Sequence, residues 1–258
     1  MRTLLVFTVI LAASGRAEDW SKRFDVAGQP ELRIQAGDAA VTLRAGAAGA
    51  VSARLTSQGR AIGTDEVRVH TRQDGNRIEM EVRAAGNPWG FGSRSVSLEV
   101  LVPEELRAEI HTDDGRVSAQ GLKGEFRFVT GDGAIEAESL DGALSARSGD
   151  GSVRVRGRFD QIDLRTNDGS IEASFDRGSK MAGPWRVETG DGNVTIRLPE
   201  GFAADLDAHT GGGGISVSLP VTTTGFHNGD HNFRGKLNGG GLPLRIRTGD
   251  GSIRLERL

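Results

Sequence analysis

The sequence predicts an all-β protein, a single-domain flattened β-solenoid (β-helix) with about 18 residues and two short strands in each coil. Two repeating features predict this fold. A turn motif, Asp-Gly followed by a variable and then an aliphatic residue, recurs with a period of about 18 residues before its spacing widens. Its copies begin at Asp114, Asp132, Asp150, Asp168, Asp191 and Asp250. From Thr112 to Ser174 the chain also divides into nonapeptides whose sixth and eighth residues are always apolar, as in half-buried strands.

Charge alternation indicates how the coils stack. In a parallel stack, residues one coil apart become neighbours about 4.8 Å apart, so opposite charges should alternate along each column. One column reads Ser118, Glu136, Arg154 and Glu172, and another, in sequence order, reads Glu109, Arg127, Ser145, Asp163, Arg186, Asp207 and Arg245. Like charges never meet in either column. This favours parallel stacking over a meander of antiparallel hairpins, which would accept the same Asp-Gly turns.

Residues 1–17 read as a signal peptide. Arg2 precedes an apolar stretch from Leu4 to Ala13 that is too short to span a bilayer, and Gly15-Arg16-Ala17 fits a cleavage site. We expect cleavage after Ala17 and export to the periplasm, the cell surface or the medium. The mature chain should carry no integral membrane segment.

Residues 18–108 are expected to form degenerate coils and a cap, because the end units of a solenoid are atypical. Glu66 to Arg83 predicts a hairpin around Asp74-Gly75-Asn76. A longer loop should follow from Ala84 to Ser95, and Val96 to Val102 should form a strand. We treat residues 18–258 as one continuous domain.

Residues 109–258 predict the regular solenoid, with the C-terminal insertions confined to one edge. The insertions are Phe175–Pro184, Pro199–Asp205 and Leu219–Pro243. Loops on one side of a repeat scaffold are a usual place for binding. The candidate binding residues there are Trp185, Phe202, Phe226, His227, Asp230, His231 and Phe233. The segment 219–243 could instead cap the C-terminal end, with Phe226 and Phe233 covering the last strand, Ser252 to Leu258, and we expect this cap.

Two groups of polar residues resemble metal sites, but we expect no bound metal. His227, Asp230 and His231 lie in a loop, where a spacing of four does not bring side chains together as it does on a helix. The motif aspartates form a column, yet Gly212 replaces one of them, which a turn tolerates and a ligand position does not. We expect the aspartates to form Asx turns with the glycines at positive φ, and the preceding threonines to cap the same turns. A calcium-stabilised repeat is the alternative.

The composition and the motif content of the chain exclude several classes of function. The chain has no cysteine and a formal net charge of -3, which excludes thiol nucleophiles and cysteine-ligated metals and argues against nucleic acid as a partner. No Gly-x-Ser-x-Gly, P-loop or His-Glu-x-x-His motif occurs. We therefore expect neither enzymatic activity nor a cofactor.

The combined pattern resembles the bacterial putative-adhesin β-strand-repeat family, a domain of unknown function related to the head-GIN domain. The resemblance rests on the Thr-Gly-Asp-Gly-x-Ile turns, on the Leu198-Pro199 break and on the closing run from Lys236 to Ile253. It covers nearly all of the mature chain and implies a non-catalytic β-helix of the bacterial envelope.

Together these features predict an exported adhesion or interaction scaffold whose partner is an envelope protein or a glycan. The alternative is a polysaccharide-active or glycan-binding β-helix that uses the C-terminal edge loops.

Overall fold

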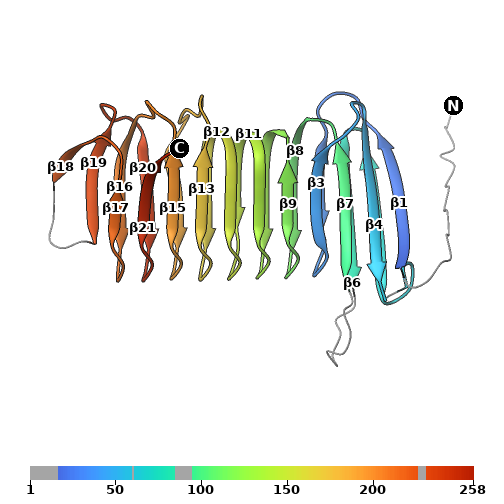
Figure 1. The fold of residues 1–258 in the computed structure, drawn as a ribbon. Coiled ribbons are helices and arrows are strands. Elements are labelled where there is room, and N and C mark those ends of the chain that lie inside the picture. The colour runs from blue at the N-terminus through green and yellow to red at the C-terminus, as the bar shows by residue number, and fades with distance from the viewer. Residues whose placement is uncertain (1–16, 60, 85–94, 226–230) are drawn as a thin grey trace.

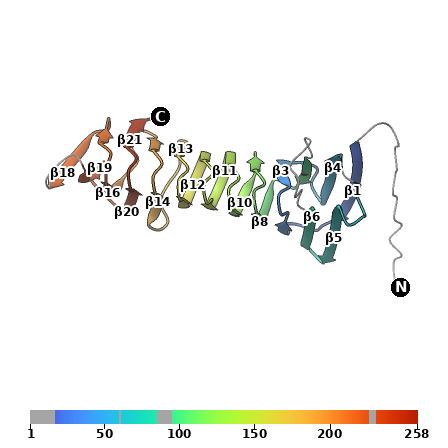
Figure 2. The same ribbon diagram turned by 90° about the horizontal axis from the view of Figure 1, so that it is seen from below.

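The computed structural model describes residues 17–59, 61–84, 95–225 and 231–258. The predicted signal peptide up to residue 16 and most of the loop predicted at Ala84–Ser95 lie outside these residues. The described residues form 21 strands and no helix, and the strands make one continuous, open sheet folded into two facing layers (Figures 1 and 2). The fold is therefore all-β and resembles a β-solenoid.

The middle of the molecule contains strands that pair in parallel at the predicted spacing. These strands are β8 (Glu105–Thr112), β9 (Val117–Gln120), β10 (Lys123–Thr130), β11 (Ile135–Arg147), β12 (Val153–Thr166), β13 (Ile171–Phe175), β14 (Trp185–Thr189) and β15 (Val194–Leu198). Phe126 lies beside Leu144, and Leu144 beside Ile162, each one predicted repeat further along the chain. The antiparallel meander is therefore wrong for this region, and parallel stacking is confirmed.

The charge column on one layer also has the predicted contacts. Arg154 lies between Glu136 and Glu172, at 3.6 Å and 3.5 Å from their carboxylate oxygens. Because these side chains are partly exposed, each pair contributes only about 0.2–1 kcal/mol. Their main effect is to favour one register of the stack.

The C-terminal coils do not follow one another in sequence order. The strands are β16 (Ala204–Thr210), β17 (Ile215–Val217), β20 (Pro243–Thr248) and β21 (Ile253–Arg257). β20 lies between β14 and β16 (Figure 2), and β21 lies between β15 and β17 (Figure 1). The last strand is thus inside the stack, so our expectation that it forms the exposed C-terminal end is wrong.

The apolar residues of the coil formed by β20 and β21 explain why this coil lies between two others. The inward residues of β20 and β21 are all buried, namely Leu244, Ile246, Ile253 and Leu255. In the coil at the end of the stack, two alanines, Ala204 and Ala208, flank Leu206 on the inward face of β16, and Ile215 and Val217 of β17 are half-exposed. Placing the more apolar coil between two others removes more apolar surface from water. The insertion also sets Arg245 beside Arg186, so like charges do meet in the second column.

A hairpin caps the C-terminal end of the stack. It consists of β18 (Val221–Gly225) and β19 (Asn232–Leu237), and β19 pairs antiparallel with β16. Phe233 is half-buried and packs against the core, as the predicted cap requires. The cap pairs with β16 and not with the last strand, however, and Phe226 lies outside the described residues.

The N-terminal end is capped in a similar way. Its strands are β1 (Ala17–Asp25), β2 (Glu31–Gln35), β3 (Ala40–Ala45), β4 (Ala50–Gln58), β5 (Val67–Asp74), β6 (Arg77–Ala84) and β7 (Val96–Val102). The coil of β2 and β3 stacks in parallel on β8 and β9, while β6 and β7 lie on its other side. The predicted hairpin around Asp74 and the predicted strand from Val96 to Val102 are confirmed. Antiparallel β5, β4 and β1 complete this cap.

The tight turns along one edge are held by threonine and glycine. The Thr130 hydroxyl accepts a hydrogen bond from the Gly133 N–H (3.1 Å) and donates one to the Gly115 carbonyl of the previous coil (3.2 Å). A Cβ at Gly133 would collide with that same carbonyl oxygen. Gly133 is not among the glycines with positive φ, so our expectation about φ is wrong. Glycine stands there because only a residue without a side chain allows the coils to approach.

Candidate functional site

Two of the predicted binding residues belong to the core. Trp185 is fully buried and Phe202 is 6% exposed. Their ring centroids are 5.2 Å apart, and Phe175 and Phe159 continue the same row of rings on the other side of Trp185. The Trp185 Nε1–H donates a hydrogen bond to the Asp160 carbonyl at 3.0 Å. The structure therefore brings these two residues together, but as packing beneath the edge loops and not as a binding surface.

The remaining candidates lie near the C-terminal cap. His231 is exposed, and its Nδ1 lies 3.0 Å from the Gly213 carbonyl oxygen. Phe233 follows on β19, while Phe226, His227 and Asp230 lie outside the described residues. Within the described ranges, no cluster of three histidine, cysteine, aspartate or glutamate side chains could hold a metal ion.

The column of aspartates is exposed at the tight-turn edge. The turn N–H groups donate to the hydroxyls of Thr130, Ser148 and Thr189, in place of the Asx bonds that we expected from aspartate. Partial desolvation, and then the nearby carboxylates of Asp38 and Asp132, raise the pKa of Asp114. Neighbouring carboxylates therefore repel the charge of Asp114, and the hydroxyl side chains stabilise the turns beside it.

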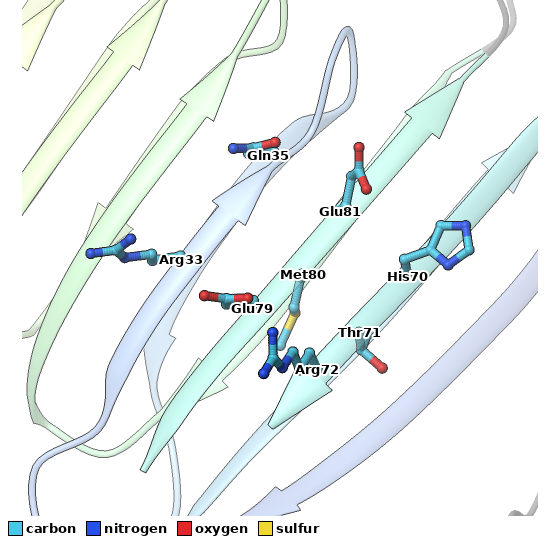
Figure 3. Close-up of a pocket in the computed structure, with 8 residues that line it drawn as sticks. All are labelled: Arg33, Gln35, His70, Thr71, Arg72, Glu79, Met80 and Glu81. Carbon is cyan, nitrogen blue, oxygen red and sulfur yellow. The ribbon is translucent and has the colours of Figure 1, made fainter. Parts of the chain in front are cut away.

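The structure shows a hollow that the sequence did not reveal. It has a volume of about 330 Å³ and lies on the N-terminal cap across β2, β6 and β5 (Figure 3). Its lining residues are Arg33, Gln35, His70, Thr71, Arg72, Glu79, Met80 and Glu81. The strand register places the outward side chains in two rows that cross β2, β6 and β5 in that order. One row contains Gln35, Glu81 and His70, and the other contains Arg33, Glu79 and Arg72. The two carboxylates thus occupy the middle strand, with hydrogen-bond donors on each side.

The two carboxylates are already paired within their own strand. Glu79 accepts a hydrogen bond from the Arg77 Nε–H at 3.0 Å, and Glu81 accepts one from the Arg83 Nε–H at 2.6 Å. Each arginine lies two residues from its glutamate, on the same outward face of β6. The negative charge of the middle strand is therefore balanced by its immediate neighbours.

Two further lining residues also have partners. Arg33 pairs with Glu31 at 3.1 Å and with Glu109 of β8 at 3.6 Å. The Thr71 hydroxyl accepts a hydrogen bond from the Lys22 ammonium at 2.6 Å. These contacts fix both side chains without any ligand.

Three lining side chains differ from these. In the part of the chain that the structure describes, no hydrogen bond or ion pair engages Gln35, His70 or Arg72. All three are exposed. The hollow therefore offers an amide, an imidazole and a guanidinium around two carboxylates whose charge is balanced by neighbouring arginines.

Sequence reasoning missed this hollow because its strands are distant in the chain. The polar alternation of β5 and β6 was visible, and their hairpin was predicted. The pairing of β6 with β2 was not, because residues 31–35 and 77–81 are not related by the repeat spacing. Without that pairing, Gln35 and Glu81 cannot be placed side by side.

Comparisons with known proteins find one family and several solved structures. The family model described as Toastrack DUF4097 matches residues 106–256. A "putative cell adhesion protein" from Clostridium sporogenes is 15% identical, with a TM-score of 0.40 over 93% of this chain and 100% of that one. A "putative adhesin" from Parabacteroides merdae is 9% identical, with a TM-score of 0.35 over 92% and 95% of the two chains. No curated protein matches this chain.

Proposed function

We propose that this chain, which belongs to the Toastrack DUF4097 family, is a non-catalytic scaffold for adhesion or interaction in the bacterial envelope. The observation that carries the proposal is the distribution of free polar groups. Ion pairs engage many of the charged side chains on the two layers, such as Arg127 and Arg154. Three polar side chains that line the hollow, Gln35 on β2 and His70 and Arg72 on β5, are not engaged in this way by described residues. A stack whose faces carry many ion pairs, with a hollow lined by polar groups that are not so engaged, suits presentation of a binding surface.

Two further features support parts of this proposal. The registers of β10, β11 and β12, each offset by one repeat, support a flattened β-solenoid with two strands in each coil. The apolar stretch from Leu4 to Ala13, followed by Gly15-Arg16-Ala17, supports export through a signal peptide. The described residues contain no helix that could span a bilayer.

The carboxylates of the hollow suit a binding role. Glu79 and Glu81 each accept a hydrogen bond from an arginine and keep oxygen lone pairs for further donors. The carboxylates of this hollow therefore suit hydrogen-bond acceptance from a ligand.

The test uses the purified mature chain, residues 18–258, as a probe. We expect it to retain a glycan or an envelope protein on a glycan array or in a pull-down from cell envelopes. Retention should fall when Gln35 and Arg72 are both changed to alanine and should persist in His231→Ala. No ligand in either assay would contradict the proposal. Turnover of an envelope polysaccharide that His231→Ala abolishes would establish the enzymatic alternative instead.

A further inference from the structure

We infer that the hollow on β2, β5 and β6 binds a sugar carrying one carboxylate, such as a uronic acid residue of an acidic polysaccharide. This inference rests on the proposed function, because it names the ligand class of the same site. It begins from the arrangement of the two rows, which place donors on the outer strands and acceptors on the middle strand.

The middle strand supplies acceptors for hydroxyl groups. Glu79 and Glu81 are half-buried, and each accepts one hydrogen bond from an arginine, Arg77 and Arg83 respectively. An ionised carboxylate has about four acceptor positions, so both retain room for further donors. Adjacent hydroxyls of a sugar ring are donors of this kind.

The outer strands supply donors for an anion. Arg72 belongs to β5 and Gln35 to β2, on opposite sides of the strand that carries the two carboxylates (Figure 3). A planar guanidinium forms two parallel hydrogen bonds with a carboxylate, and Arg72 is the lining guanidinium without an ion pair to described residues. A neutral sugar would leave this group without a charged partner.

The charge of the hollow selects a monoanion. The hollow has no net positive charge, because its lining residues and their ion-pair partners together contain equal numbers of arginines and glutamates: Arg33, Arg72, Arg77 and Arg83 against Glu31, Glu79, Glu81 and Glu109. A doubly charged phosphate would meet the two glutamates at close range, and the resulting repulsion would offset its attraction to Arg72. One carboxylate flanked by hydroxyls satisfies both sets of groups.

The volume also suits a small polar ligand. At about 330 Å³, the hollow lies at the low end of the range of about 300–1,000 Å³ for small-molecule sites. No phenylalanine or tryptophan is among its described lining residues, so binding would rest on hydrogen bonds. Weak binding at a single site becomes effective when a polymer presents many copies of the same sugar to many protein molecules.

The test titrates methyl glucuronide, methyl glucoside and glucose 6-phosphate into the mature protein and follows binding by calorimetry or ligand-observed NMR. We expect methyl glucuronide to bind about tenfold more tightly than the other two, which corresponds to about 1.4 kcal/mol. Arg72→Gln should weaken glucuronide binding by about tenfold. The matched control is Arg68→Gln, because Arg68 is exposed on the same strand, pairs with Asp65 and does not line the hollow.

Each other outcome overturns the inference. Equal binding of methyl glucoside would show that the carboxylate is not recognised, and preference for glucose 6-phosphate would assign a phosphate site. Unchanged binding in both Arg72→Gln and Gln35→Ala would place the ligand elsewhere, and thermal melting would verify that these variants fold. If the protein still retains envelope partners but does not bind glucuronide, the inference fails and the proposed function stands.

Discussion

At the tight-turn edge, the absence of a side chain at one position sets how closely successive coils stack. A Cβ at Gly151 would collide with the carbonyl oxygen of Gly133, which is backbone and cannot move aside alone. We predict that Gly151→Ala lowers the free energy of unfolding by about 1–3 kcal/mol, the usual cost of overpacking. Urea denaturation would measure it. Gly214→Ala is the control, because nothing lies within 4 Å of a Cβ there, and it should change stability by less than about 0.5 kcal/mol. Equal effects of the two changes would refute the stacking explanation.

The aromatic row beneath the edge loops gives a second prediction for single residues. Trp185 is fully buried between Phe175 and Phe202. Trp185→Ala should therefore lower the free energy of unfolding by about 3–5 kcal/mol, as large deletions in a core do, and chemical denaturation would measure this change. Ligand retention by the fraction that still folds should be unchanged. A loss of binding without a loss of stability would instead indicate that Trp185 is a binding residue, as the sequence predicted from its position beside an edge loop.

At the level of strands, the inserted final coil gives a prediction that a sequence-ordered stack would not share. Thr195 on β15 is the register partner of Arg254 on β21, and Arg254 is the partner of Ser216 on β17. Neighbouring strands lie about 4.8 Å apart, within the Cα separation that a disulfide spans, whereas strands two apart do not. The variant with Thr195→Cys and Arg254→Cys should form a disulfide on oxidation.

The control for this experiment pairs Thr195→Cys with Ser216→Cys and should stay reduced. The chain has no native cysteine, so either disulfide is read directly by mass spectrometry. A disulfide in the control and none in the first variant would mean that the coils stack in sequence order.

The insertion also marks the limit of what the sequence could predict. The repeat spacing predicted which side chains neighbour one another in the regular part, such as Leu144 and Ile162, because adjacent coils there are consecutive in the chain. After Leu198 insertions interrupt the repeat, and a later coil can join the stack on either side of an earlier one. The total apolar burial of the finished stack decides between these sides, and local spacing does not encode it. The hollow was hidden for the same reason, because it depends on β2 pairing with β6.

Across the whole molecule, the charged side chains fall into two groups with opposite effects on stability. Burial alone would raise the pKa of Asp163, but hydrogen bonds from Arg165 at 2.9 Å and Arg147 at 3.1 Å outweigh it and lower that pKa. A hydrogen bond from Arg197 likewise lowers the pKa of Glu172. At the turn edge, in contrast, partial desolvation and neighbouring carboxylates raise the pKa of Asp114. The ion pairs of Asp163 and Glu172 therefore stabilise the fold at neutral pH, while the charge of Asp114 at the turn edge opposes it.

The directions of these pKa shifts predict how the free energy of unfolding changes in acid. A carboxylate whose pKa is lowered by folding contributes stability above its unfolded pKa, about 3.9 for aspartate, and this stability is lost as the pH falls through the folded value. The free energy of unfolding should thus decrease as the pH falls below about 4. Asp163→Asn should lower stability at pH 7 by about 1 kcal/mol and flatten the acid dependence, because the ionised contacts with its arginines are lost.

A variant at the turn edge should change stability in the opposite direction to Asp163→Asn in the same pH series. A carboxyl group whose pKa is raised by folding destabilises the fold once it ionises, so its effect is largest above its folded pKa and disappears in acid. Asp114→Asn should therefore raise the melting temperature slightly at pH 7, because it removes a charge that its neighbours repel. Denaturation at a series of pH values measures this variant and Asp163→Asn together. A loss of stability in Asp114→Asn at pH 7 would show that the aspartate column holds the turns after all.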